Sequence, residues 1–170
     1  LYFLHALANV GQLISIAPGK RWLLLDGGEV FLNMNPLRQL SFLLTTWWYY
    51  INWSIAFPVA GLGDSLPNGF EQKTLEQLLK IPVGERVEFI EFADELIEKS
   101  NLTWTAKTEN TQDLLRASIN RIVIRILKDF GGVELEHIKE PLGNGEIKKL
   151  IAFNITSLGK ALLESVSIMG

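Results

Sequence analysis

The amino-acid sequence predicts a mainly α-helical protein with small β-hairpins (an α+β fold), built from two related units that an aromatic-rich helix joins. Three observations lead to this prediction. A helix–hairpin–helix pattern occurs twice, turns containing Pro and Gly interrupt both copies, and apolar residues recur at helical spacing. The predicted units are residues 1–57, an incomplete first unit with its connecting helix, residues 58–70, a linker loop, and residues 71–170, a complete second unit.

The internal repeat consists of two matched pieces that occur in the same order. Residues 22–32 align with residues 153–163, and residues 7–13 align with residues 127–133. The interval between the two pieces is longer in the second copy, as expected where the tip of a hairpin varies in length. Each copy is therefore expected to form a helix, a hairpin and a second helix.

Local signals mark the same boundaries in both copies. Because glycine tolerates positive φ, Gly11 and Gly131 are expected to end the first helix of each copy. Pro and Gly at residues 17–20 and 141–145 predict the two hairpin turns. The residues available as N-caps of the helices that follow the hairpins are Asp26, Thr156 and Ser157.

The connecting helix is expected to begin at Asn35-Pro36, because proline is accepted at the first helical position. No charged residue occurs from residue 39 to residue 63, a run long enough to span a bilayer. Its Trp and Tyr residues lie in the middle of the run and not at the two ends, so we expect a buried helix and no membrane association. The predicted inward stripe is Leu37, Leu40, Leu44, Trp47 and Ile51.

The aromatic residues of this helix have further interpretations besides an intramolecular core. Interface cores favour Trp and Tyr, so the cluster is also a candidate seam of a homodimer or of a complex with a protein partner. Stacking on nucleic-acid bases is a third use of such side chains. The candidate interface residues are Trp47, Trp48, Tyr50 and Trp53.

The second unit has a complete series of predicted elements. They are a helix at 71–80, a short strand at 85–88, a helix at 89–99, a helix at 111–130, a hairpin at 133–155 and a final helix. The residues of helix 89–99 expected to be buried are Ile90, Phe92, Ala93, Leu96 and Ile97. The core stripe expected for helix 111–130 is Leu115, Ile119, Ile122, Val123, Ile126 and Leu127.

This order of elements, the segment Pro82-Val-Gly-Glu-Arg-Val87 and the exit sequence of residues 153–163 together resemble a winged helix-turn-helix domain. The resemblance covers residues 71–168, and residues 1–34 resemble only the back half of such a unit. It implies that helix 111–130 is the recognition helix, which enters the major groove of duplex DNA, and that residues 133–155 form the wing. The function implied is that of a DNA-binding protein of the transcription-regulator type.

The candidate DNA-binding residues lie on the outward face of helix 111–130 and on the wing. Arg and Asn read base edges, whereas Lys contacts phosphates. A plain solvated surface stays an alternative, because the net charge of −3 and the pI of 5.5 are not those of a basic domain and Ile124 lies beside the reading face. The candidates are Gln112, Arg116, Asn120, Arg121, Arg125, Lys128, Lys139, Lys148 and Lys149.

No catalytic, metal or cofactor site is predicted. The sequence has no cysteine, so disulfides and thiolate metal sites are excluded, and His5 and His137 have no partner at the spacing that metal sites require. The carboxylates of residues 88–98 follow helical spacing, which favours a solvated face over an acid–base pair. Phosphate-loop, dinucleotide and nucleophile-elbow patterns are absent.

We therefore expect a non-enzymatic, cytoplasmic protein. The absence of cysteine fits a reducing compartment, and no basic region of a signal peptide precedes the first apolar residues. Two alternatives to DNA binding stay open. One is a protein-interaction scaffold, which the acidic net charge and the Trp/Tyr cluster favour. The other is a non-catalytic domain of a larger nucleic-acid enzyme, such as a helicase-associated domain.

Overall fold

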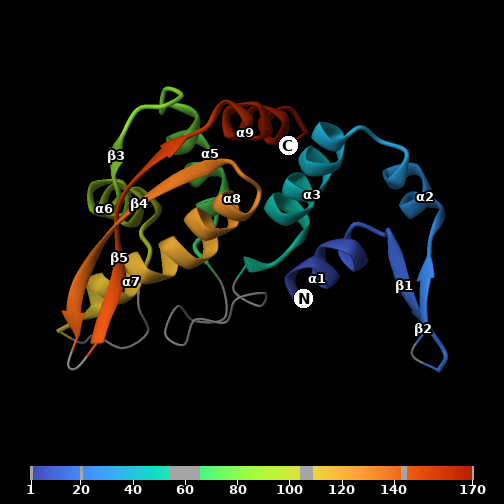
Figure 1. Ribbon diagram of the computed structural model, residues 1–170, viewed down its shortest axis with the longest axis horizontal. Coiled ribbons are helices and arrows are strands. Elements are labelled where there is room, and N and C mark those ends of the chain that lie inside the picture. Colours follow the sequence, from blue (N-terminus) through green and yellow to red (C-terminus); the bar gives the residue numbers. More distant parts are fainter. Residues whose placement is uncertain (1, 20, 54–65, 104–108, 143–144, 170) are drawn as a thin grey trace.

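The chain forms a mixed α/β structure with two antiparallel sheets, as the computed structural model of residues 2–19, 21–53, 66–103, 109–142 and 145–169 shows (Figure 1). The N-terminal elements are α1 (Tyr2–Val10), β1 (Ile14–Ala17), β2 (Arg21–Leu24), α2 (Asp26–Leu32) and α3 (Pro36–Tyr50). They are followed by α5 (Phe70–Leu79), β3 (Val87–Glu88), α6 (Phe89–Ser100), α7 (Thr111–Ile119), η1 (Asn120–Ile124), α8 (Arg125–Asp129), β4 (Val133–Leu142), β5 (Gly145–Ile155) and α9 (Ser157–Met169). The predicted fold class, helices with small hairpins, is confirmed.

The two hairpins lie at opposite ends of the molecule, with α3 and α9 between them (Figure 1). Helix α3 packs against α9 and α1, and α5 packs against α6 and α9. Strands β1 and β2 form a two-stranded sheet, whereas β5 is the central strand of a three-stranded sheet in the order β3-β5-β4. In the second hairpin, β5 thus pairs with a strand on each side. Among the described residues, β1 and β2 pair only with each other.

Helix α3 begins where the sequence predicts. The side-chain oxygen of Asn35 accepts a hydrogen bond from the backbone N–H of Arg38 at 3.0 Å, and Pro36 occupies the first turn. The helix has 15 residues and ends at Tyr50. Its burial begins at Ser41, so the first turn stands outside the core and the prediction that Leu37 is buried is wrong.

The remainder of the charge-free run lies largely outside the described residues, which resume at Leu66. So does most of the predicted linker, residues 58–65. The last residue of the predicted linker 58–70, Phe70, is fully buried and is the first residue of α5. Among the helices that the structure describes, none has the length and apolar character needed to cross a bilayer.

Tryptophan rings from α3 and the residues after it form the centre of the molecule. Trp47 and Trp53 stack with ring centroids 5.4 Å apart and an interplanar angle of 11°. Trp48 and Phe70 each meet Trp53 edge-on. The indole N–H of Trp53 donates to the carbonyl oxygen of Trp47 at 2.8 Å, and that of Trp48 donates to the carbonyl oxygen of Glu71 at 3.1 Å. Both indoles are thereby buried with a hydrogen-bond partner.

One hydrophobic core runs through both predicted units. The same cluster of buried side chains contains Leu7 of α1, Leu44 of α3 and Leu163 of α9. Phe3 of α1 contacts the ring of Trp47 at 5.3 Å and that of Phe130, beyond α8, at 6.4 Å. Residues 2–53 and 66–169 are therefore expected to unfold together.

In the second unit, α8 ends in a Schellman motif. The N–H of Gly132 donates to the carbonyl oxygen of Leu127 at 2.7 Å, and the N–H of Gly131 donates to that of Lys128 at 2.9 Å. Gly131 has a φ of 72°, a conformation that favours glycine. The prediction that Gly131 ends this helix at positive φ is confirmed.

The first unit ends α1 with the same motif. The N–H of Leu13 donates to the carbonyl oxygen of Ala8 at 2.8 Å, and the N–H of Gln12 donates to that of Asn9 at 3.1 Å. By these bonds Gln12 corresponds to Gly131, and Leu13 corresponds to Gly132. The repeat is present in the backbone geometry, one residue away from the alignment of residues 7–13 predicted above.

Positive φ in the first unit therefore falls on Gln12, at 55°, and not on Gly11 as predicted. Gly11 is needed for a different reason. A Cβ atom there would lie 2.9 Å from the carbonyl oxygen of Leu7 and 3.0 Å from the ring of Phe42. The glycine allows the end of α1 to approach α3 closely.

Both units also close their hairpins in the same way. The N–H of Leu25 donates to the carbonyl oxygen of Leu13, and the N–H of Thr156 donates to that of Gly132, both at 3.0 Å. The next helix then crosses the Schellman turn at a glycine. A Cβ at Gly28 would lie 2.3 Å from the oxygen of Leu13, and one at Gly159 would lie 1.9 Å from the oxygen of Gly132. These are the two glycines that the aligned pieces match.

Two local predictions need correction. Asp26 does not cap α2 but is its first residue, and the preceding Leu25 has no side-chain capping bond, whereas Thr156 accepts from the N–H of Gly159 at 2.9 Å as expected of an N-cap. Strand β4 also continues through Pro141, which was expected in a turn. Proline is tolerated there because β4 is an edge strand of its sheet.

The predicted helix 111–130 consists of α7, a π-helical turn at Asn120–Ile124 and α8. All six residues of the predicted core stripe are buried. Ile124, expected beside the exposed face, is fully buried as well. A π-helical turn holds an extra residue, so Ile122, Val123 and Ile124 all reach the core. In α6, Ile90 is exposed, and its predicted burial is wrong.

Candidate nucleic-acid interface

The outward side of α7, η1 and α8 carries a depression of about 510 Å³. Its walls are Ala117, Asn120, Arg121, Arg125, Ile126 and Asp129. Arg121 and Arg125 are exposed, whereas Asn120 is half-buried and its side-chain oxygen is itself buried, without a partner among the described residues. Lys128 is exposed one turn beyond Arg125. We call Asn120, Arg121, Arg125 and Lys128 the cationic face.

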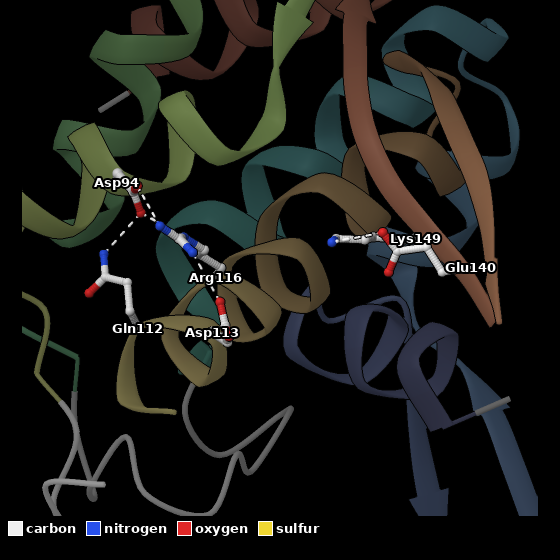
Figure 2. A network of polar contacts seen from close by, with 6 residues as sticks. All are labelled: Asp94, Gln112, Asp113, Arg116, Glu140 and Lys149. Atoms are coloured by element: carbon white, nitrogen blue, oxygen red, sulfur yellow. Dashed lines mark hydrogen bonds and ion pairs between the residues drawn. The ribbon is translucent and has the colours of Figure 1, made fainter. Parts of the chain in front are cut away.

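Arg116 lies outside the cationic face because its guanidinium joins α7 to α6 (Figure 2). Nε and one Nη donate to the two carboxylate oxygens of Asp94 at 2.8 and 2.7 Å, and the other Nη donates to Asp113 at 2.9 Å. Gln112 also donates to Asp94, at 2.9 Å. These bonds use the donors that a groove contact would need, so Arg116 and Gln112 are better explained as structural residues.

The hydrogen bonds from Arg116 hold the pKa of Asp94 below its usual value, and the carboxylate in turn raises the pKa of Arg116. A carboxyl group whose pKa is depressed on folding stabilises the folded state above its unfolded pKa. That contribution is lost as the pH falls through the folded pKa. Because both side chains still reach water, the contribution is modest.

Asp94→Asn is expected to lower the free energy of unfolding by about 1 kcal/mol near neutral pH, since Arg116 loses its charged partner. The difference from the unaltered protein disappears at a pH below the folded pKa of Asp94, where the carboxyl is protonated. Urea unfolding at both pH values measures this. Glu91→Gln, which removes an exposed carboxylate from the same helix, is the control and leaves the midpoint unchanged.

The hairpin β4–β5 offers fewer free cations than the sequence suggests. Lys139 forms an ion pair with Glu146 at 2.8 Å. Lys149 forms one with Glu140 at 3.0 Å (Figure 2). Both pairs are cross-strand neighbours that cancel charge on the hairpin. Lys148 is exposed, and within the described ranges its side chain makes no hydrogen bond or ion pair. Of the three predicted wing lysines, Lys148 is the one available to a phosphate.

A polar cluster that crosses the three-stranded sheet from β3 to β4 was not predicted. Arg86 donates to Glu136 of β4 at 2.6 Å and forms an ion pair with Glu88 of β3. These bonds raise the pKa of Arg86 and lower that of Glu136. The residue types gave no signal, because the cluster depends on which strands become neighbours. The cluster joins the segment before β3 to β4. Because Arg86 pairs with both carboxylates, they are not available as an acid–base pair.

The two histidines do not form a site with acidic residues. The ring of His5 meets the ring of Trp22 edge-on at 4.5 Å, and His137 is exposed on β4. Within the part of the chain that the structure describes, no group of three His, Asp or Glu side chains is placed to hold a metal ion.

For the three tryptophans of the candidate interface set, burial supports the intramolecular core. Trp47, Trp48 and Trp53 are buried within a single chain, so they form core and not a surface seam. Tyr50 is 70% exposed and is the one member of this set on the surface. Its neighbour Tyr49 donates its hydroxyl to the carbonyl oxygen of Val166 at 3.1 Å, and burial raises its pKa.

The geometry thus reduces nine candidate contacts to five residues, the cationic face and Lys148. Comparisons of the chain with models of known protein families, with curated proteins and with solved structures found no match.

Proposed function

We propose that this protein is a non-enzymatic, duplex DNA-binding protein of the regulatory type, which contacts DNA through the cationic face. The observation that carries the proposal is the depression on α7, η1 and α8, which is lined by two exposed arginines, Arg121 and Arg125, beside the half-buried Asn120. Arg is a side chain that reads the edge of guanine bidentately in a major groove. Lys128 and Lys148 supply phosphate contacts on either side.

The arrangement around this face supports the proposal. The elements α5, β3, α6, α7–α8, β4 and β5 follow one another as expected from the winged helix-turn-helix resemblance, and the sheet order is β3-β5-β4. The helix with the cationic face is followed directly by the hairpin that carries Lys148. A major groove admits one α-helix, and the adjoining hairpin is then close to the backbone.

Acidic residues reduce the positive charge that this surface offers to phosphates. Asp129 lies on the wall of the depression, and Glu140 and Glu146 neutralise lysines on the hairpin. With only four cations, the salt dependence of binding is expected to be shallow, because each neutralised phosphate releases counterions in proportion. A weak or sequence-dependent interaction fits this charge distribution better than a tight non-specific one.

The double variant Arg121→Glu/Arg125→Glu is expected to weaken binding to a labelled random-sequence duplex roughly tenfold or more, with a salt slope smaller by about two. Fluorescence anisotropy at several salt concentrations measures both quantities. The control Arg38→Glu/Lys80→Glu makes the same change in net charge at two exposed positions elsewhere, one on α3 and one directly after α5. Equal loss in both double variants, or no binding by the folded wild type at low salt, would refute the proposal.

A second candidate function, protein interaction, is favoured by a separate observation. Large apolar side chains are exposed on the first unit, and exposed apolar patches of this kind mark interaction surfaces. They are Leu4, Ile16, Trp22, Leu23, Leu24, Val30 and Leu32.

A further inference from the structure

One face of the first hairpin is apolar and open to solvent. The register of β1 and β2 pairs Ile14 with Leu24 and Ile16 with Trp22, so all four side chains lie on the same face. Ile16, Trp22 and Leu24 are 57%, 56% and 51% exposed. We call these four residues the first-hairpin face.

The second unit contains the same face in a covered form. There Val133 pairs with Ile155 and Leu135 pairs with Phe153, in the same register relative to the Schellman turn and the closing hydrogen bond. Val133, Phe153 and Ile155 are only 4%, 1% and 0% exposed. Equivalent apolar positions are therefore open in one unit and buried in the other.

The cover in the second unit comes from β3 and α6, and α5 packs on α6. The ring of Phe92 on α6 meets Phe153 edge-on at 5.2 Å. Val87 of β3 pairs with the same residue along the strand, and the N–H of Gly84 donates to the carbonyl oxygen of Ile155 at 2.9 Å. One helix–strand–helix segment thus supplies both the apolar cover and the third strand.

The first hairpin has, within the part of the chain that the structure describes, neither the apolar cover nor the third strand. Among the described residues, β2 pairs with β1 alone, so its outer edge is open where the corresponding β5 bears β3. Trp22 is held against His5 by a ring contact of 4.5 Å, so the apolar surface is already ordered. An exposed edge beside apolar side chains is a template for adding a strand.

We propose that the first-hairpin face binds a separate helix–strand–helix segment with the pattern of α5–β3–α6. The strand of this partner pairs antiparallel with the outer edge of β2 at Trp22. Its second helix places an apolar or aromatic side chain on Trp22, as Phe92 does on Phe153. The partner is recognised by this alternation of an amphipathic helix, a short strand and an amphipathic helix, and not by charge.

The test uses the full chain and, as probe, a labelled synthetic peptide with the sequence of residues 70–100. Saturable binding in fluorescence anisotropy is expected, with at least a tenfold loss in Trp22→Glu. Ile16→Glu, also at an exposed position, gives a second variant should Trp22→Glu not fold. Tyr50→Glu, which alters an exposed aromatic residue elsewhere, is the matched control and binds normally.

Absence of binding, equal binding of a scrambled peptide, or unchanged binding by the folded Trp22→Glu and Ile16→Glu variants overturns the proposal. The last result would mean that the peptide binds elsewhere, for example by replacing α5–β3–α6 in its own unit. A dimer of the full chain that Ile16→Glu disrupts and the peptide does not displace also overturns it, in favour of a second copy. The Arg121→Glu/Arg125→Glu variant binds the peptide normally, which separates this surface from the DNA contact.

Discussion

Gly159→Ala is expected to lower the free energy of unfolding by about 3 kcal/mol or more. The added Cβ would lie 1.9 Å from the carbonyl oxygen of Gly132, a backbone atom fixed by the Schellman turn and by its bond from the N–H of Thr156. To relieve the overlap, the start of α9 must move, and α9 carries Leu162, Leu163 and Val166 into the core. The higher helix propensity of alanine, worth about 1 kcal/mol, is too small to compensate.

Urea or guanidinium unfolding followed by circular dichroism measures the effect. Ser157→Ala, in the same turn of α9 but exposed, is the control and changes stability by less than about 0.5 kcal/mol. A Gly159→Ala variant as stable as Ser157→Ala would contradict the described crossing of α9 over the turn.

Trp47→Ala is expected to cost about 3–5 kcal/mol, the usual range for a fully buried large aromatic residue. Trp47 lies between Phe3 of α1 and Trp53, so its removal opens a cavity in the core that the two units share. Because one core passes through both units, the variant unfolds in a single transition at a lower denaturant concentration. Tryptophan fluorescence and circular dichroism are expected to give the same midpoint.

Tyr50→Ala, a truncation of an exposed neighbour on the same helix, serves as the comparison and costs less than about 0.5 kcal/mol. Two separate transitions in the unaltered protein, only one of which Trp47→Ala shifts, would show that the units have independent cores.

The elements of the fold were predictable because each depends on residues that are close together in the sequence. Asn35 and Pro36 set the start of α3, Thr156 caps α9, and the apolar spacing of residues 115–127 gives the buried stripe. The repeat was visible for the same reason, since a glycine is required wherever a helix crosses the Schellman turn. The one-residue error arose because Gln12 takes the positive φ that sequence reasoning reserves for glycine.

Exposure was harder to predict, because it depends on which elements become neighbours. Leu37 and Ile90 follow the apolar pattern of their helices but stand outside the core. Ile124 does not follow it, yet the π-helical turn carries it inward. A pattern with a period of 3.6 residues cannot anticipate such a turn.

The position of the candidate site was predictable, but the set of residues that belong to it was not. The sequence located the basic side of residues 111–130, and Arg121 and Arg125 do line its depression. Arg116 has the same residue type and spacing but binds Asp94, which lies 22 positions earlier in the sequence. The pairing of Lys139 and Lys149 with glutamates likewise depends on strand register. Long-range pairs of this kind carry no signal in a single sequence.

The two proposed surfaces use different parts of the molecule. The cationic face belongs to the covered second unit, whereas the first-hairpin face belongs to the open first unit at the other end (Figure 1). A protein with both could bind DNA and a partner at the same time. Loss of either contact is therefore expected to leave the other intact.

The most direct test of the DNA contact is a comparison of lysine reactivity toward an amine-acylating reagent, with and without a saturating random-sequence duplex. Lys128 and Lys148 are the two lysines of the proposed contact, and Lys80 is exposed beyond α5. The duplex is expected to protect Lys128 and Lys148 and to leave the reactivity of Lys80 unchanged. Full reactivity of Lys128 and Lys148 in the presence of bound duplex would contradict this expectation.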